Sequence, residues 1–162
     1  GVKPVETRTG NSYTKKISVE NDYPFGGEMS GHLYFRDKFI GNDDGIYAGL
    51  RLVEILSKTN KKCTELLDNI PVYYSTDENK VLVEDAIKDK IVSRVEEYAK
   101  EKGYNYLTID GVKVLYDDGF ALVRKSNTTP NITTRYEAKT KERLEEITNE
   151  YNSLLDKLKE EE

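Results

Sequence analysis

The chain has 162 residues, of which 36% are hydrophobic and 34% charged, and its formal net charge is −5. This length suits one domain or two small ones, and the mixed composition excludes a wholly disordered chain. No stretch approaches the ~20 apolar residues of a membrane helix, and the acidic balance argues against nucleic-acid binding. Cys63 is the only cysteine, which excludes an intrachain disulfide framework and predicts a cytoplasmic protein.

Up to Pro71, the sequence predicts short elements joined by loops. The expected strands are residues 2–9 and 32–36, and the expected helices are residues 12–19, 46–58 and 64–68. Residues 21–27 predict a loop, and Asp43 and Asp44 are expected to cap the following helix. Two strands would struggle to bury enough apolar surface alone.

After Pro71 the pattern changes to one helix, a run of strands and a closing helix. The expected strands are residues 72–76, 104–116 with a tight turn at 110–111, 120–124 and 132–137, and the expected helices are residues 83–102 and about 140–158. Gly103 is a natural end for the first helix. This order predicts an α+β fold whose antiparallel sheet is flanked by helices and is complete within residues 72–162.

The glycine-rich segment 25–32 is the first candidate site. Its glycines free the backbone around Glu28, Ser30 and His32, the only histidine. A carboxylate and a hydroxyl can accept from and donate to neighbouring sugar hydroxyls. The alternative is a glycine-rich connection with a satisfied surface glutamate.

The segment 124–130 is the second candidate site. Arg124 precedes Ser126, Asn127 and Thr128 between two expected strands. A guanidinium, hydroxyls and turn amides are the groups that bind phosphate. The alternative is a solvated hairpin loop. The sequence offers no metal site, since Asp43 and Asp44 do not match a calcium loop.

Five segments of the sequence resemble the α-D-phosphohexomutases: Gly27–His32, Phe35-Arg36-Asp37, Asp43–Ala48, Ser126–Pro130 preceded by Arg124, and Arg135-Tyr136-Glu137-Ala138. The resemblance covers essentially the whole chain, and Met29 is typical of the phosphomannomutase/phosphoglucomutase branch. It implies that residues 1–71 are the C-terminal part of the family's third α/β domain, with the sugar-binding loop. Residues 72–162 would be its fourth, TATA-binding-protein-like domain, which binds phosphate.

The resemblance also implies an activity, the interconversion of hexose 1-phosphate and 6-phosphate through a phosphoserine and a hexose 1,6-bisphosphate, with Mg²⁺. Glu28 and Ser30 would hold sugar hydroxyls, and Arg124, Ser126, Asn127 and Thr128 would hold the distal phosphate. His32 would assist near the reacting centre. The sequence has no Ser-His-Asn nucleophile motif and no Asp-x-Asp-x-Asp metal loop. We therefore expect a C-terminal fragment that is inactive alone, with the missing N-terminal domains and a hexose phosphate as its partners.

A different class remains open. The chain could be an autonomous α+β module that binds a phosphorylated ligand or protein without a catalytic role. Its acidic balance and the lack of a basic aromatic face argue against nucleic acid as that ligand.

Overall fold

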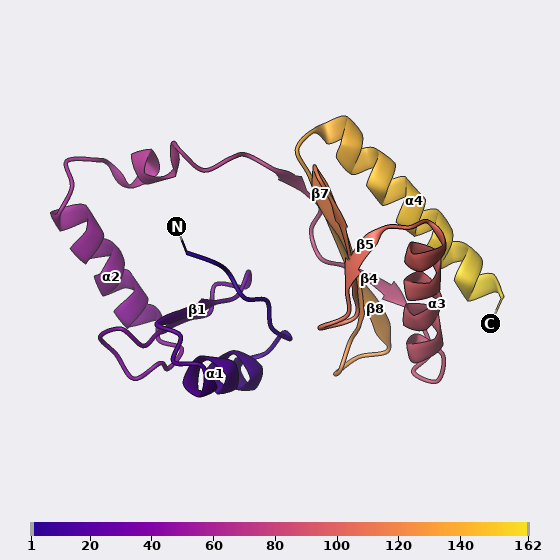
Figure 1. Cartoon of the computed structure of the whole chain (residues 1–162), viewed down its shortest axis with the longest axis horizontal. Helices are drawn as coiled ribbons and strands as arrows, with labels where there is room; N and C mark the ends of the chain where they lie inside the picture. Colours follow the sequence, from indigo (N-terminus) through magenta and orange to yellow (C-terminus); the bar gives the residue numbers. More distant parts are fainter. Residues whose placement is uncertain (1, 162) are drawn as a thin grey trace. The chain divides into compact units, whose positions relative to one another are not determined.

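The computed structural model describes residues 2–161, and the chain divides into an N-terminal unit, Gly1–Pro71, and a C-terminal unit, Val72–Glu162. Figure 1 shows both units, coloured by position in the sequence. Within the described residues, no helix is both long and apolar enough to cross a membrane.

The N-terminal unit is built around a short hairpin. Its elements are α1 (Asn11–Glu20), β1 (Phe25–Gly27), β2 (Leu33–Phe35), α2 (Gly45–Ser57) and a 3-10 helix, η1 (Cys63–Leu67). Strands β1 and β2 are antiparallel, with Gly26 opposite Tyr34. A Cβ atom at Gly26 would lie 2.9 Å from Thr14 Cγ2, so glycine allows α1 to approach the hairpin closely.

Aromatic contacts hold the N-terminal unit together. The Phe35 ring lies 5.0 Å from that of Phe25 and 5.5 Å from that of Tyr47, which stacks on Phe39 at 4.1 Å. Among the described residues of this unit, Tyr34 is the only fully buried hydrophobic side chain. Helix α2 buries none of its residues, so the hairpin, not a helix-packed core, organises this unit.

Two predictions for the N-terminal unit are wrong. Residues 2–9 form no strand, because no other strand in the described part of the chain pairs with them. The expected loop at 21–27 ends in strand β1, which exists because β2 pairs with it despite its two glycines. The helices expected at 12–19, 46–58 and 64–68 are confirmed with small shifts of their ends.

The C-terminal unit is an antiparallel sheet with two helices. Its elements are β3 (Tyr74–Ser75), β4 (Asn79–Leu82), α3 (Lys88–Glu101), β5 (Asn105–Leu107), β6 (Val112–Tyr116), β7 (Gly119–Lys125), β8 (Asn131–Ala138) and α4 (Lys141–Glu160). The strand order is β3-β8-β7-β6-β5, and β4 also pairs with β8. The expected α+β fold with an antiparallel sheet flanked by helices is thereby confirmed.

Helices α3 and α4 lie on the same face of this sheet (Figure 1). Alternate strand residues point toward them, and the helices contribute an apolar stripe. The resulting core includes Val114, Val123, Ile132, Val95 and Ile147, each 0–1% exposed. Burial of this many side chains supplies a hydrophobic core within the unit itself.

Helix ends in this unit follow local chemistry. Gly103 adopts a φ of 70° after α3, and Tyr104 donates its backbone N–H to the Ala99 carbonyl at 2.9 Å. This left-handed cap is the one expected for Gly103. The Thr140 side chain accepts from the Arg143 N–H at 3.1 Å and so caps the start of α4.

The outer edge beside β8 is interrupted. Strand β3 pairs with one end of β8 and β4 with the other, and residues 76–78 break the edge between them. In the break, the Tyr136 N–H donates to the Thr76 hydroxyl at 3.1 Å, so a side-chain oxygen replaces a backbone carbonyl.

This edge corrects two further expectations. The predicted strand 72–76 shrinks to β3, and β4 was not predicted. The helix predicted from residue 83 begins at Lys88, because the Val83 N–H still donates to the Pro130 carbonyl at 3.2 Å. The sequence prediction therefore started this helix five residues too early.

Candidate functional site

The tip of the β1–β2 hairpin holds the first group of predicted site residues. The Glu28 N–H donates to the His32 carbonyl at 2.9 Å, and the Gly31 N–H donates to the Glu28 carbonyl at 2.9 Å. Gly31 has a φ of 91°, a backbone conformation that residues other than glycine rarely adopt. The turn therefore brings Glu28, Ser30 and His32 to one tip.

Two neighbours fix the Glu28 carboxylate. The Tyr34 hydroxyl donates to Glu28 Oε1 at 3.0 Å, and the Thr14 hydroxyl donates to the same atom at 3.4 Å. Burial raises the pKa of Tyr34 to about 12, and the bond to Glu28 adds to the shift. Oε2 has no hydrogen-bond partner in the described part of the chain, so it remains available to an incoming donor.

His32 is paired with an acid that the sequence reasoning assigned to capping. Its Nδ1 lies 2.6 Å from Asp43 Oδ2. Because a carboxylate only accepts, Nδ1 is the donor, and in the neutral tautomer with this bond Nε2 is an acceptor. Asp44 does cap α2, accepting from the Tyr47 N–H at 2.9 Å. The capping prediction is thus confirmed for Asp44 and wrong for Asp43. Ser30 is exposed at the tip.

The loop between β7 and β8, residues 126–130, holds the second group. Its ends are tied by the Ser126 N–H, which donates to the Asn131 carbonyl at 3.0 Å. The Ser126 hydroxyl oxygen accepts from the N–H groups of Thr128 and Thr129 at 3.3 and 3.2 Å and lies 2.8 Å from the Thr129 hydroxyl. These bonds make the segment a compact loop in which the hydroxyls gather.

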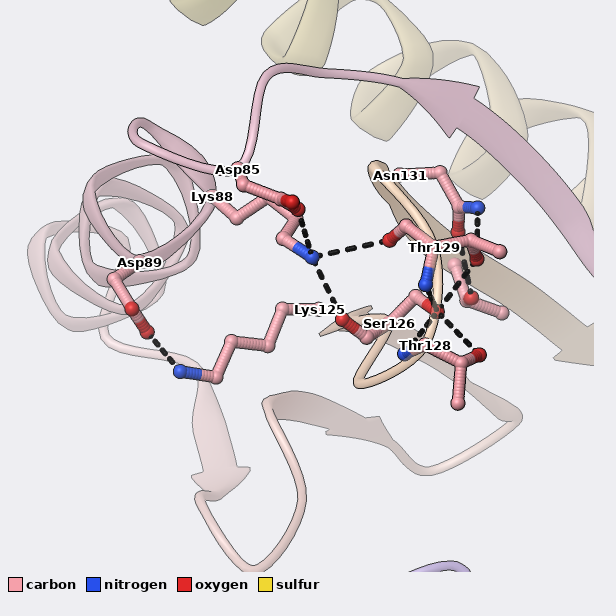
Figure 2. Close-up of polar contacts among 9 residues, drawn as sticks. Asp85, Lys88, Asp89, Lys125, Ser126, Thr128, Thr129 and Asn131 are labelled. Atoms are coloured by element: carbon pink, nitrogen blue, oxygen red, sulfur yellow. Dashed lines mark hydrogen bonds and ion pairs between the residues drawn. The ribbon is translucent and has the colours of Figure 1, made fainter.

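Lys88, the first residue of α3, contacts this loop from the side of the helix (Figure 2). Its ammonium donates to the carbonyls of Ser126 at 2.8 Å and Thr129 at 3.0 Å, and pairs with Asp85 at 2.6 Å. The residue is only 8% exposed. Sequence reasoning missed Lys88; the only available signal was a cation at a helix N-terminus, where the dipole disfavours it.

The other predicted phosphate ligands have different surroundings. Arg124 follows buried Val123 on β7, so its side chain lies on the sheet face opposite the helices, where its guanidinium is 3.6 Å from Glu78 Oε1. Asn127 is exposed and, within residues 2–161, has no intramolecular hydrogen bond. Lys125 pairs with Asp89. The structure thus joins Ser126 and Thr128, while Arg124 is held separately by Glu78.

The two groups belong to different compact units. Neither forms a metal centre, because within the described residues no cluster of three His, Cys, Asp or Glu side chains could hold a metal ion. The structure therefore offers two candidate sites, a carboxylate–hydroxyl–imidazole group at the hairpin tip and a hydroxyl-rich loop between β7 and β8.

Comparison with known proteins gives the family of both units. Residues 1–74 match the family model described as "Phosphoglucomutase/phosphomannomutase, alpha/beta/alpha domain III". Residues 78–153 match the one described as "Phosphoglucomutase/phosphomannomutase, C-terminal domain". The chain belongs to the phosphoglucomutase/phosphomannomutase family. The predicted α-D-phosphohexomutase resemblance, to the C-terminal portion of the family, is confirmed.

Relatives of this family align with nearly the whole chain. The phosphomannomutase/phosphoglucomutase of Pseudomonas syringae pv. tomato is 40% identical over 98% of this chain and 34% of its own length. The phosphoglucomutase/phosphomannomutase of Thermococcus kodakarensis is 38% identical over 90% of this chain and 31% of its own. The chain therefore spans about a third of the length of the curated relatives it matches.

A solved structure agrees with this assignment. A phosphoglucomutase/phosphomannomutase family protein from Burkholderia thailandensis superimposes with a TM-score of 0.83 at 38% sequence identity. The match covers 94% of this chain and 32% of that one. The comparisons of sequence and of structure thus agree on the mixed fold and the family.

Proposed function

We propose that the chain supplies the substrate-recognition part of a phosphomannomutase/phosphoglucomutase, which interconverts hexose 1-phosphate and hexose 6-phosphate. Residues 1–71 would present the sugar-binding loop, and residues 72–162 would form the phosphate-binding domain. The family of both units and the names of the relatives support this proposal.

The observation that carries the proposal is the grouping of hydroxyl and amide donors in the β7–β8 loop. Its hydroxyls gather around Ser126, and the Asn127 N–H has no intramolecular partner within residues 2–161. Hydroxyl and amide donors around one point suit phosphate oxygens, and a guanidinium supplies the charge. In the proposal, Ser126, Asn127 and Thr128 hold the phosphate that does not react, and Arg124 exchanges Glu78 for it.

The hairpin tip has the complementary role. A site that accepts a substrate in two orientations must recognise the groups common to both, which are the ring hydroxyls and the unreactive phosphate. The free Oε2 of Glu28 accepts from such hydroxyls, and the Ser30 hydroxyl donates to or accepts from them. His32, oriented by Asp43, keeps Nε2 available for a proton near the reacting centre.

The remaining chemistry belongs to the whole enzyme. We assign the phosphoserine and Mg²⁺ to its other domains and the hexose 1,6-bisphosphate to its reaction cycle. No step is assigned to a metal in this chain, because no described cluster here fits one. The exposed thiol of Cys63 suits a reducing, cytoplasmic setting.

The decisive experiment titrates the chain with inorganic phosphate and follows its backbone amides by NMR. We expect shifts at Ser126 and Asn127. Charge-assisted hydrogen bonds contribute about 1.5–3 kcal/mol, so Arg124→Ala should weaken binding roughly ten- to a hundredfold. Glu78→Gln removes a competing carboxylate and should tighten binding a few-fold. Arg94→Ala, which removes a charge from α3, is the matched control and should change little.

Two outcomes would contradict the proposed function. If phosphate binds Arg124→Ala as well as the parent, the assignment of the phosphate loop is wrong. Equal perturbation of these amides by an oligonucleotide or a phosphopeptide would favour the autonomous binding module.

The activity has its own test. We expect the chain alone to remain at background with glucose 1-phosphate, magnesium and the bisphosphate, because phosphoryl transfer here needs a covalent carrier and charge neutralisation. Turnover that persists after repurification would contradict this division of roles.

A further inference from the structure

Lys88 occupies a position that disfavours a cation twice over. It begins α3, where the helix dipole is positive, and its side chain is only 10% exposed. A buried charge destabilises a protein unless it is paired and hydrogen-bonded. The Lys88 ammonium has three N–H donors, and three acceptors surround it: Asp85, the Ser126 carbonyl and the Thr129 carbonyl.

Two of these acceptors belong to the β7–β8 loop, 38 and 41 residues further along the chain. One ammonium therefore ties together two carbonyls from opposite ends of the short loop. Figure 2 shows it between Asp85 and these two residues. The Thr129 carbonyl also accepts from the Asn131 N–H at 2.8 Å, whereas for the Ser126 carbonyl Lys88 is the one donor among the described residues.

The orientation of one peptide group has a direct chemical consequence. In a planar trans peptide, the C=O and the following N–H point in opposite directions. Because the Ser126 carbonyl is directed at Lys88, the Asn127 N–H is directed away from it. The peptide after Thr129 leads into Pro130, which has no N–H. Asn127 therefore presents the one loop amide whose direction Lys88 sets and whose donor has no partner within residues 2–161.

We propose that Lys88 is a positioning residue that orients the β7–β8 loop for phosphate, acting through the carbonyls of Ser126 and Thr129. This inference rests on the proposed function of that loop. Lys88 does not act as a phosphate ligand, because Asp85 and the two carbonyls take all three of its donors.

A neighbouring lysine provides a matched control. Lys125 lies at the end of β7 and also pairs with an aspartate of α3, Asp89. Within the described residues it does not bond to the loop carbonyls. Lys88→Met and Lys125→Met therefore remove the same charge close to the same loop, and only the first removes the link to the carbonyls.

The test measures inorganic phosphate binding to the full chain by amide NMR. A small displacement of positioned groups has large effects on recognition, so Lys88→Met should weaken binding about tenfold. Lys88→Arg, which keeps the charge and donors, should recover most of the affinity, and Lys125→Met should stay within about twofold of the parent. In the absence of phosphate, the Asn127 amide signal should shift in Lys88→Met and not in Lys125→Met.

These measurements distinguish failure of the proposed phosphate-binding function from failure of the positioning role of Lys88. Failure of the parent to bind phosphate through this loop contradicts the proposed function, whereas the phosphate-free Asn127 signal still decides the role of Lys88. Equal phosphate affinity in Lys88→Met and the parent overturns the inference, as does equal weakening by Lys125→Met. If Lys88→Met does not fold, Lys88→Gln, which keeps two donors, is measured instead and is held to the same comparison with Lys125→Met.

Discussion

The two units hold their candidate binding groups on very different supports. In the C-terminal unit, the β7–β8 loop, the proposed phosphate site, joins two neighbouring strands of a sheet that shares its core with both helices. In the N-terminal unit, the hairpin tip rests on Tyr34 and an aromatic cluster, while Leu50 on α2 remains 61% exposed. The contrast teaches that clustered polar side chains can be hydrogen-bonded in a defined arrangement without a large hydrophobic core beneath them.

The largest expected difference is in local stability. Amides in β6, β7 and β8 should exchange with solvent at least about a thousandfold more slowly than those of α2, because only the former are covered by a core. Hydrogen exchange of the full chain measures this directly. Limited proteolysis should cut first within residues 1–30 or 59–71 and leave the C-terminal unit. Preferential survival of the N-terminal unit would reverse the comparison.

The next difference is in the effect of removing apolar side chains. Ile147→Ala should lower the free energy of unfolding of the C-terminal unit by about 2–5 kcal/mol, because Ile147 is fully buried. Leu50→Ala should change stability by less than about 0.5 kcal/mol, since its side chain is largely exposed. Urea unfolding of both variants checks the pair; equal losses would mean that α2 is packed more tightly than its exposure indicates.

Alkaline pH should affect the C-terminal unit more. Burial raises the pKa of Tyr116 to about 12 and also raises the pKa values of Tyr98 and Tyr151. The folded state thus favours neutral phenols, so stability is fully present below pH ~10 and is lost as the pH rises through the folded pKa values. In the N-terminal unit, burial likewise raises the pKa of Tyr34.

Urea midpoints at about pH 8 and about pH 11 test this expectation. Tyr151→Phe removes one ionisable group and should reduce the loss between the two conditions. An identical loss in that variant would attribute the alkaline effect to other groups, such as the lysine ion pairs.

The smallest expected effect is a stabilisation. Gly49 lies within α2, and a Cβ atom there would meet nothing within 4 Å. Gly49→Ala should therefore stabilise α2 by about 0.5–1 kcal/mol. Helix content in the N-terminal unit, followed by chemical shifts, measures the gain. A loss would show that this face of α2 is covered.

Sequence reasoning succeeded where the signal was local. Helix ends depend on contacts within a few residues, as at Gly103, Thr140 and Asp44. The hairpin turn at Gly111 likewise depends on the positive φ of one residue. The Gly-rich and Ser-Asn-Thr segments stood out by their unusual composition, and their roles stay predictions.

Failures occurred where a distant partner decides the structure. Strand β4 has only four residues and exists because β8, 50 residues later, pairs with it. Residues 2–9 alternate in polarity but find no partner strand in the described chain. Lys88 acts on backbone carbonyls, which every residue possesses, so no side-chain pattern could indicate its target. Asp43 has the sequence position of a helix cap, but its carboxylate pairs with His32, which lies eleven residues earlier in the chain.

The interrupted edge beside β8 has a consequence for the behaviour of this protein at high concentration. A long, regular edge strand exposes unpaired backbone groups to which another chain can add its own strand. Here the edge is divided into β3 and β4, and at the break the Thr76 side chain takes a place that a backbone carbonyl would fill in a regular ladder. The opposite edge, β5, has only three residues. Both borders of the sheet are therefore poor templates for intermolecular strand addition, and short or broken edges of this kind disfavour edge-to-edge aggregation.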